Sequence, residues 1–361
     1  GNIISLYDKR TGKEYVERGG ELNQLRMYLE DKDGGMKAWY INRIVEEEDV
    51  TNVKSVEVEE VGPVRACVKS VKTWGNSRFI ERAYIYRSYP RIEYDLEVRW
   101  LETGSDSAHS PMLRATFPIK MENPSFYSHV PFDVVERPID GKLNGEPTPH
   151  YIKHRDVYGI EAADKDGQEV PAQHWADLTD GKTGIALLNN CKYGYSVHED
   201  KLRLTLMRAA GEPDLYPNLG KFNIRYALYP HAGDWTNGVW SEGDNFNVPV
   251  YAAEPPSSSL VREHATCPEE ASSLSLDGDG VVLTGIKKAE EGNELIVRVA
   301  ETEGSKSKTT LTLPVEINSV HRLNLLEMPL EDKMPRPSFK GKTIKFKLDP
   351  HEIATLGISW E

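Results

Sequence analysis

Hydrophobic and polar residues alternate along most of this chain. Between residues 91 and 100, one face would carry only apolar side chains and the other only charged ones. The apolar set is Ile92, Tyr94, Leu96, Val98 and Trp100, and the charged set is Glu93, Asp95, Glu97 and Arg99. A period of two predicts a half-buried antiparallel strand. Residues 64–69, 202–206 and 222–228 repeat the pattern.

Short polar segments separate these runs. Trp74–Ser77, Glu102–Ser105 and Thr179–Lys182 contain the Gly, Asn and Asp residues that favour turns. We find no convincing stretch of about 12 residues with the 3.6-residue spacing of a helix. Many short strands joined by turns predict an all-β chain, either a sandwich or a barrel.

The composition changes near Ala253, where the Pro- and Ser-rich segment Glu254–Ser259 begins. The alternation restarts further on, at Leu295, Val297 and Val299, and again at residues 344–348. At about 150 residues per domain, 361 residues fit two domains. We therefore predict a large β domain over residues 1–250, a connector over residues 251–270 and a small β-sandwich over residues 271–361.

The charge narrows the classes of partner. Lys plus Arg is 44 and Asp plus Glu is 57, a net charge of −13, which disfavours nucleic acid and anionic membranes. No apolar run approaches the roughly 20 residues of a membrane span. Three widely spaced cysteines argue against a disulfide framework and a Cys-type zinc site, so we expect a reducing, cytoplasmic location. The chain starts inside an expected strand without a signal-peptide layout, which suggests a piece of something longer.

Residue types alone point to two candidate sites. His150 and His154 have metal-ligand spacing, but Pro147 and Pro149 precede them and no third ligand follows, so a solvated loop is favoured. Residues 171–195 combine aromatic rings with amides and carboxylates, as sugar sites do. The alternative, which composition favours, is a buried Trp and Tyr pair with Asp and Asn in turns. No nucleophile elbow, Walker loop or dinucleotide fingerprint is present.

The same segment carries a family resemblance. VPAQHWADLTDGKTGIALLNNCKYGYSV, LRLTLMRAAGEPD and FNIRYALYPHAGDW resemble the C-terminal β region of glycoside hydrolase family 38, the α-mannosidases, and most of all its cytosolic and bacterial branch. GNIISLYDKRTGKEYV resembles the first strands of that region, and ERPIDG its middle. The tail, from LTGIKKAEEGNELIVRVAETEG to LDPHEIATLGISW, resembles the small sandwich that ends these enzymes. The chain departs from the family pattern at Asp133 and over residues 143–166.

The resemblance implies a fold and a parent activity. The expected fold is a large antiparallel super-sandwich of the galactose-mutarotase type, followed by a small terminal β-sandwich. Complete enzymes of the family hydrolyse α-mannosides with retention, using an N-terminal catalytic domain that holds zinc through two His and two Asp. Those motifs are absent from this sequence. The resemblance therefore implies a chain without catalytic residues or cofactor of its own, inactive alone, whose partners are the catalytic domain and, through it, mannosides.

The resemblance also suggests residues at the rim of the sugar pocket or at the domain interface. Trp39 matches a place where the family presents an aromatic ring, with a core Trp as the alternative. Arg208 and Asp214 lie in a segment that matches a loop facing the catalytic domain, with a surface salt bridge as the alternative for Arg208. Trp175, Asp177 and Asn190 are further candidates, although Asp177 and Asn190 favour turn or cap roles.

Two other functions stay open. Mutarotases and sugar epimerases share the super-sandwich and use a His with a Glu, but no motif for that His matches here. A free-standing carbohydrate-binding or structural module is the third possibility. The upstream reading frame would separate these interpretations, because a catalytic domain with its zinc motif belongs only to the first.

Overall fold

The strand predicted over residues 91–100 is present, and its alternation decides which face is buried. In the computed structural model, β8 (Ile92–Trp100) buries Tyr94, Leu96, Val98 and Trp100 on its core side. The structure describes residues 1–33, 37–39, 41–105, 107–140, 142–143, 146–147, 169–211, 214, 216–253, 268, 270–330 and 335–360. Everything below refers to these residues.

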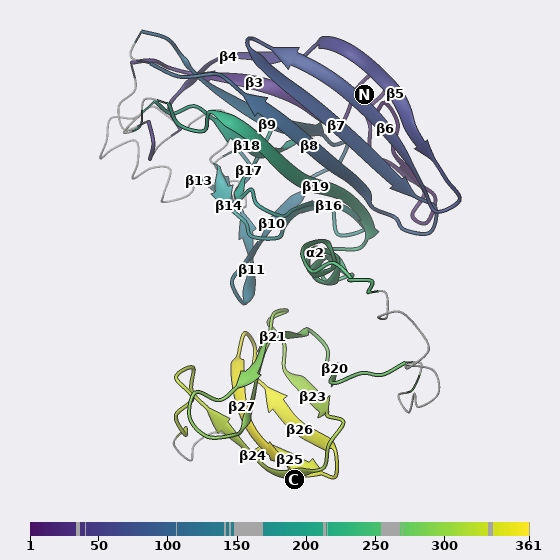
Figure 1. Cartoon of the computed structure of the whole chain (residues 1–361), viewed down its shortest axis with the longest axis vertical. Helices are drawn as coiled ribbons and strands as arrows, with labels where there is room; N and C mark the ends of the chain where they lie inside the picture. The colour runs from purple at the N-terminus through teal and green to yellow at the C-terminus, as the bar shows by residue number, and fades with distance from the viewer. Residues whose placement is uncertain are drawn as a thin grey trace. The chain divides into compact units, whose positions relative to one another are not determined.

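A nine-stranded sheet forms one layer of the larger unit (Figure 1). Its strands, from one edge to the other, are β11 (Asp133–Arg137), β10 (Ser125–Val130), β15 (Trp175–Thr179), β16 (Thr183–Asn189), β19 (Gly220–Ala232), β8, β7 (Ser77–Tyr86), β6 (Arg65–Trp74) and β5 (Asn52–Val61). The pairs from β10 to β5 are antiparallel. The predicted turns at Trp74–Ser77 and Thr179–Lys182 join β6 to β7 and β15 to β16.

A six-stranded sheet forms the other layer. Its order is β14 (Val170–Pro171), β17 (Gly194–His198), β18 (Lys201–Arg208), β9 (Ser110–Pro118), β3 (Gln24–Glu30) and β4 (Ile44–Asp49). One core joins the layers, with Leu96 and Tyr226 from the first sheet and Phe117 and Leu204 from the second all buried. Two short pairs flank the sheets: β1 (Tyr7–Asp8) with β2 (Lys13–Glu14), and β12 (Lys142–Leu143) with β13 (Glu146–Pro147).

The chain divides into two compact units. The first contains Gly1–Val130 and Val135–Pro249, and the second contains Pro131–Val134 and Val250–Glu361. The second unit has two four-stranded sheets: β20 (Ser275–Asp277), β23 (Ser307–Thr312), β26 (Thr343–Leu348) and β25 (Ser338–Lys340); and β21 (Val281–Lys288), β22 (Leu295–Glu301), β27 (Ile353–Trp360) and β24 (Ile317–Leu323). Its separate core includes Val297, Leu311, Phe346 and Leu356. The predicted all-β class, a large antiparallel super-sandwich with a small sandwich, is confirmed.

One helix was not expected. α2 (Val239–Asn247) has only nine residues, too few to show a helical period within a strand-rich sequence. Its backbone starts at Gly238, whose φ of 88° is one that L side chains rarely adopt. No helix in the described part of the chain is long and apolar enough to cross a membrane.

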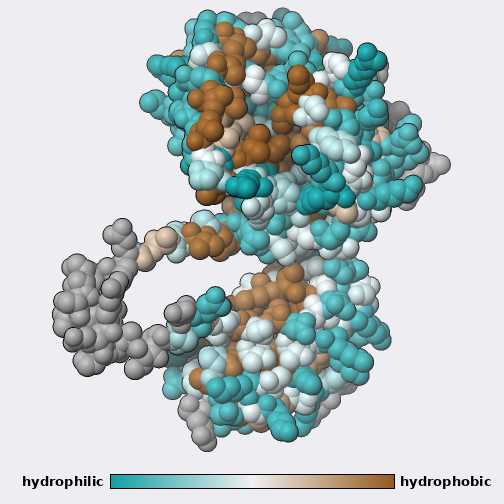
Figure 2. Space-filling view, turned by 90° about the vertical axis from the view of Figure 1, so that its right-hand side faces the viewer, coloured by the Kyte–Doolittle hydropathy of each residue, from teal (hydrophilic) through white to brown (hydrophobic). Residues whose placement is uncertain are grey.

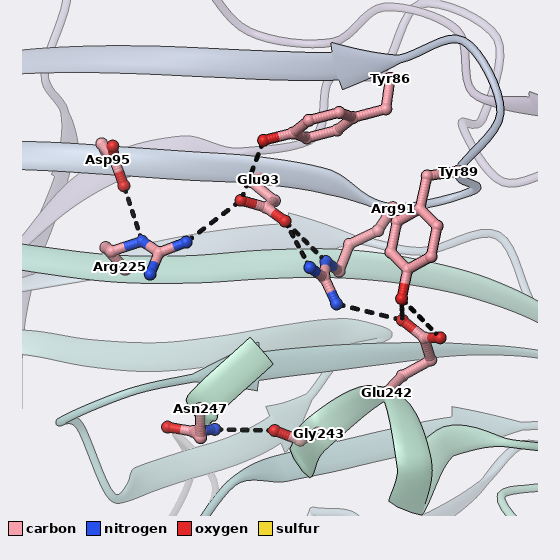
Figure 3. A network of polar contacts seen from close by, with 9 residues as sticks. All are labelled: Tyr86, Tyr89, Arg91, Glu93, Asp95, Arg225, Glu242, Gly243 and Asn247. Carbon is pink, nitrogen blue, oxygen red and sulfur yellow. Dashed lines mark hydrogen bonds and ion pairs between the residues drawn. The ribbon is translucent and has the colours of Figure 1, made fainter. Parts of the chain in front are cut away.

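Polar contacts hold α2 against the outer face of the nine-stranded sheet (Figure 3). Glu242 accepts hydrogen bonds from the hydroxyl of Tyr89 (2.7 Å) and from Nη1 of Arg91 (3.1 Å). Arg91 also pairs with Glu93, which accepts a hydrogen bond from Arg225 (3.2 Å). The ring of Phe246 lies under the guanidinium groups of both arginines, at 5.2 and 4.9 Å. The helix therefore covers charged side chains of β8 and β19 together with the ring of Trp175, which its Gly243 and Trp240 approach.

Candidate functional site

The described residues of three loops meet at one end of the six-stranded sheet, and we call them the loop cluster: 31–33, 37–39 and 41–43 after β3, 101–105 and 107–109 before β9, and 209–211, 214 and 216–219 after β18. Gly104 lies so close to the last loop that a methyl group there would collide with the carbonyl oxygen of Ala209. Nζ of the buried Lys37 donates to the carbonyl oxygen of Ser105 (3.3 Å). These contacts make the three loops one surface.

A buried ion pair holds the base of the loop cluster together. Glu30, the last residue of β3, is 0% exposed. Its two carboxylate oxygens accept hydrogen bonds from Nε (2.6 Å) and Nη2 (2.7 Å) of Arg208, the last residue of β18. The backbone N–H of Asn42 donates to the same carboxylate (3.0 Å). A bidentate, charge-assisted pair of this kind fixes both distance and angle. It therefore fixes the first loop against the end of β18.

Trp39 is the exposed aromatic residue of this surface. It lies between Lys37 and Asn42, which the contacts above anchor on either side, and its side chain is 65% exposed. The structure therefore excludes the alternative of a core Trp. An exposed ring on an anchored loop is suited to stacking on a flat apolar surface such as the C–H face of a sugar, because little conformational freedom is lost on binding.

Asp214 and its neighbours lie in the third loop of the cluster. Its carboxylate accepts a hydrogen bond from the backbone N–H of Tyr216 (2.9 Å), and both side chains are exposed. Nδ2 of Asn218 donates to the carbonyl oxygen of Arg208 (2.8 Å), which closes the loop onto the end of β18. The structure thus places Trp39 and Asp214 in the loop cluster and Arg208 at its base. Sequence reasoning missed Glu30, Lys37 and Tyr216.

Trp175 belongs to a different environment. It is fully buried on β15, and the ring of His129 stacks on it with centroids 5.7 Å apart and planes 10° apart. Trp235 stacks at 6.0 Å, and Trp240 meets it edge-on at 6.4 Å. Tyr195 is buried as well, as the buried Trp and Tyr alternative expects. Burial in this aromatic cluster, with the effect of His174 added, lowers the pKa of His129 to about 4.

Asp177 and Asn190 have structural partners. Asp177 lies within β15 rather than in a turn, and its carboxylate is 2.8 Å from Nε2 of His231. Burial alone would lower the pKa of His231, but the charge and hydrogen bond of Asp177, together with the Ala232 carbonyl and Asp234, outweigh it and the pKa is raised. Asn190 follows β16, and its Oδ1 accepts a hydrogen bond from the backbone N–H of Arg225 (3.1 Å). Asp177 and Asn190 therefore contact β19 and lie outside the loop cluster.

Metal ligation gains no support from the described residues, in which no group of three or more His, Cys, Asp or Glu side chains is placed to hold an ion. His150 and His154, the pair with metal-ligand spacing, lie outside the described residues. Cys67 and Cys191 are free thiols.

Comparison with known proteins identifies the family. The model of the family 38 glycosyl hydrolase C-terminal domain matches residues 1–216, and that of the family 38 C-terminal beta sandwich domain matches residues 280–356. The chain belongs to glycoside hydrolase family 38. The resemblance seen in the sequence is therefore confirmed, and it extends over both units of this family 38 chain.

Relatives of this family 38 chain are longer. Alpha-mannosidase G of Dictyostelium discoideum is 28% identical over 367 residues, covering 98% of this chain and 31% of the relative. The alpha-mannosidase of Saccharomyces cerevisiae is 24% identical over 382 residues, covering 98% and 33%. The chain thus spans about a third of the length of these relatives.

Solved structures share the fold. A family 38 protein from Enterococcus faecalis superimposes with a TM-score of 0.73 at 15% identity, covering 98% of this chain and 42% of that one. An alpha-mannosidase from the same organism gives 0.73 at 16% identity, covering 98% and 40%. At these identities the likeness establishes the fold alone.

Proposed function

We propose that this family 38 chain is the C-terminal, non-catalytic β region of a zinc-dependent retaining α-mannosidase. Its loop cluster would line the rim of a sugar pocket whose catalytic residues and zinc ligands belong to an N-terminal domain. The observation that carries the proposal is Trp39, an exposed ring held between two anchored residues. The mannosidase relatives, about three times as long as this chain, support the larger parent.

The proposal assigns each part of the loop cluster a task. Trp39 would stack on a sugar ring, and Asp214 would accept a hydrogen bond from a hydroxyl or from the catalytic domain. Arg208 already uses two nitrogens on Glu30, so its first task is to hold the loop that presents Trp39. Through the complete enzyme the chain would take part in mannose metabolism, in the cytoplasm, where free thiols such as Cys67 and Cys191 persist.

The 361-residue chain alone should not hydrolyse an aryl α-mannoside and should hold no stoichiometric zinc. The reason is that no catalytic or zinc motif of the family occurs in its sequence. Turnover of a nitrophenyl α-mannoside and elemental analysis of the purified chain measure both quantities. Turnover that follows the protein through gel filtration would contradict the proposal. Saturable binding of mannosides without turnover would favour the carbohydrate-binding module instead.

Replacing Trp39 with Ala in the complete enzyme should reduce kcat/KM. Losing a stacked ring would cost about 1–3 kcal/mol, or about 5- to 150-fold. Because stacking stabilises bound substrate and transition state alike, the change should appear mainly as a higher KM. Steady-state kinetics on the folded variant measure it.

Trp360→Ala is the matched control for Trp39→Ala. Trp360 is also an exposed tryptophan, 41% accessible, and it lies in the second unit. Its loss should leave kcat and KM unchanged. Equal kinetics for both variants and the wild type would show that the ring of Trp39 does not contact substrate.

A further inference from the structure

The inner face of β5, β6 and β7 carries a row of apolar side chains, of which the valines of β5 and Ile85 of β7 are exposed among the described residues. Directly paired residues lie on the same face of a sheet. Val58 pairs with Val68 and Val68 with Ala83, and Ala83 packs against the buried core. This face is therefore a continuation of the core face of the nine-stranded sheet. Its apolar members are Val53, Val56, Val58 and Val61 of β5, Ala66 and Val68 of β6, and Ala83 and Ile85 of β7.

We call this set the overhang. The four valines of β5 are all exposed, with Val58 64% and Val61 83% accessible. Seen from the side where β5 and β6 lie in Figure 1, hydrophobic side chains gather on the surface of the first unit (Figure 2). Contiguous exposed apolar surface on a soluble domain marks a contact site.

Two β-bulges keep the valines on one face. Strict alternation would send residues three apart to opposite faces, and Val53 and Val56 are three apart, as are Val58 and Val61. The pairing of β5 with β6 shifts once between Val53 and Ser55 and again between Val58 and Glu60. Each bulge adds one residue to β5, so the valine that follows the bulge points to the same face as the valine before it. The strand therefore departs from regular geometry in a way that gathers its apolar side chains.

The opposite face of the same strands carries paired charges beside the buried Cys67 and Val71. Nζ of Lys69 lies 3.0 Å from Glu57 and 3.3 Å from Glu59, and Nε of Arg82 lies 2.6 Å from Glu59. The charges on that face are paired across strands, as on a face that meets water. The overhang has no such arrangement.

The first residues of the chain lie at the overhang. Asn2 accepts a hydrogen bond from Lys72 (2.7 Å), and a methyl group added at Gly1 would lie 2.8 Å from Cβ of Ser70, the cross-strand partner of Val56. Gly1 and Asn2 therefore lie beside the inner face of β6.

We infer that the overhang is the docking surface for polypeptide that joins the N-terminal side of Gly1 in the complete mannosidase. The inference rests on the proposed function. The occupant is an apolar strand or helix face, because the exposed members of the inner face are valine and isoleucine, whereas its charged members, Lys72 and Glu81, are buried. Such a contact has the apolar character of permanent interfaces.

Thiol labelling tests the inference. Val58→Cys and its neighbour Glu57→Cys place a thiol on the overhang and on the charged face of the same strand. In the 361-residue chain both thiols should react readily with a maleimide. Peptide mass spectrometry measures the extent of labelling at each cysteine separately. In the complete protein, Val58→Cys should react at least about tenfold more slowly, because the reagent must wait for the interface to open. Glu57→Cys should keep its rate.

Each other outcome overturns the inference. Equal reactivity of Val58→Cys in both proteins would show that the overhang is not covered in the complete protein. Protection that grows with the concentration of the 361-residue chain would identify a second copy as the occupant, and protection at every concentration would mean that the chain covers itself. Labelling does not depend on activity. Protection without the kinetic effect of Trp39→Ala would therefore separate this inference from the proposed function.

A second pair of substitutions provides an independent measurement. Val56→Lys with Val58→Lys should leave the melting temperature of the 361-residue chain unchanged, since both side chains are exposed there. The same change should lower the melting temperature of the complete protein, because two charges would be buried without partners. An unchanged melting temperature in the complete protein would contradict docking at the overhang.

Discussion

Replacing Arg208 with Ala should lower the free energy of unfolding of the 361-residue chain by about 3–5 kcal/mol, the usual cost of breaking a buried ion pair from one side. Glu30 is fully buried, and the side chain of Arg208 is 17% exposed. Truncation would remove the two hydrogen bonds that Arg208 donates to the Glu30 carboxylate. Of the three that the carboxylate accepts now, only the one from the backbone N–H of Asn42 would remain. Urea denaturation measures the loss as a lower midpoint with an unchanged slope.

Two variants control this measurement. Arg43→Ala removes an exposed partner of Asp31 at 2.6 Å in the same loop, and it should cost no more than about 1 kcal/mol. Glu30→Leu combined with Arg208→Met removes both charges and should recover most of the stability lost by Arg208→Ala. If Arg208→Ala is as stable as Arg43→Ala, Glu30 is solvated and the pair does not hold the loop cluster together.

Lowering the pH from 7 to about 4 should destabilise the chain through His129 by about 3 kcal/mol. Its pKa is about 4 in the folded protein and about 6.5 when unfolded, and each pKa unit corresponds to about 1.4 kcal/mol. Below pH 6.5 the unfolded chain binds a proton that the folded chain does not take up. The contribution of neutral His129 to the free energy of unfolding is therefore fully present above pH 6.5 and is lost as the pH falls towards 4.

The matched variant for this prediction is His129→Phe, which keeps a ring against Trp175 and cannot be protonated. Other groups titrate in the same window. Carboxyls such as Asp8 and Asp180, whose pKa values are lowered, also lose stability in acid, so the quantity to compare is the difference between wild type and variant. The raised pKa of His231 acts in the opposite direction, because its contribution is complete below pH 6.5 and falls as the pH rises. Parallel stability curves for wild type and His129→Phe would show that His129 is accessible to protons in the folded state.

The strands could be predicted because their chemistry is local. In β8 the apolar residues alternate, and side chains on successive residues point to opposite faces. Glu93 shows the limit of that reasoning. It falls on the predicted solvent face, yet it is buried, because Arg91, Arg225 and Tyr86 surround it there. None of these contacts follows from the period of one strand.

The candidate site could be predicted only in part for the same reason. Trp39 and Arg208 were found through family resemblance, and the structure brings their loops together. Glu30 carries no local signal, since it shares the outer face of β3 with Arg26 and resembles any charged side chain at a strand end. Its role arises from Arg208, 178 residues away. Conversely, Trp175 and Asp177 have sugar-site chemistry but lie inside the aromatic cluster and beside His231.

The two bulges of β5 decide which changes of length the strand can accept. Each bulge adds one residue to the pairing with β6, so losing the codon of Lys54 or Glu59 would leave the valines on either side two residues apart and still on one face. Losing the codon of Glu57, between the bulges, would make Val56 and Val58 neighbours and send them to opposite faces. One-residue deletions in this strand should therefore be tolerated at the bulges and selected against between them.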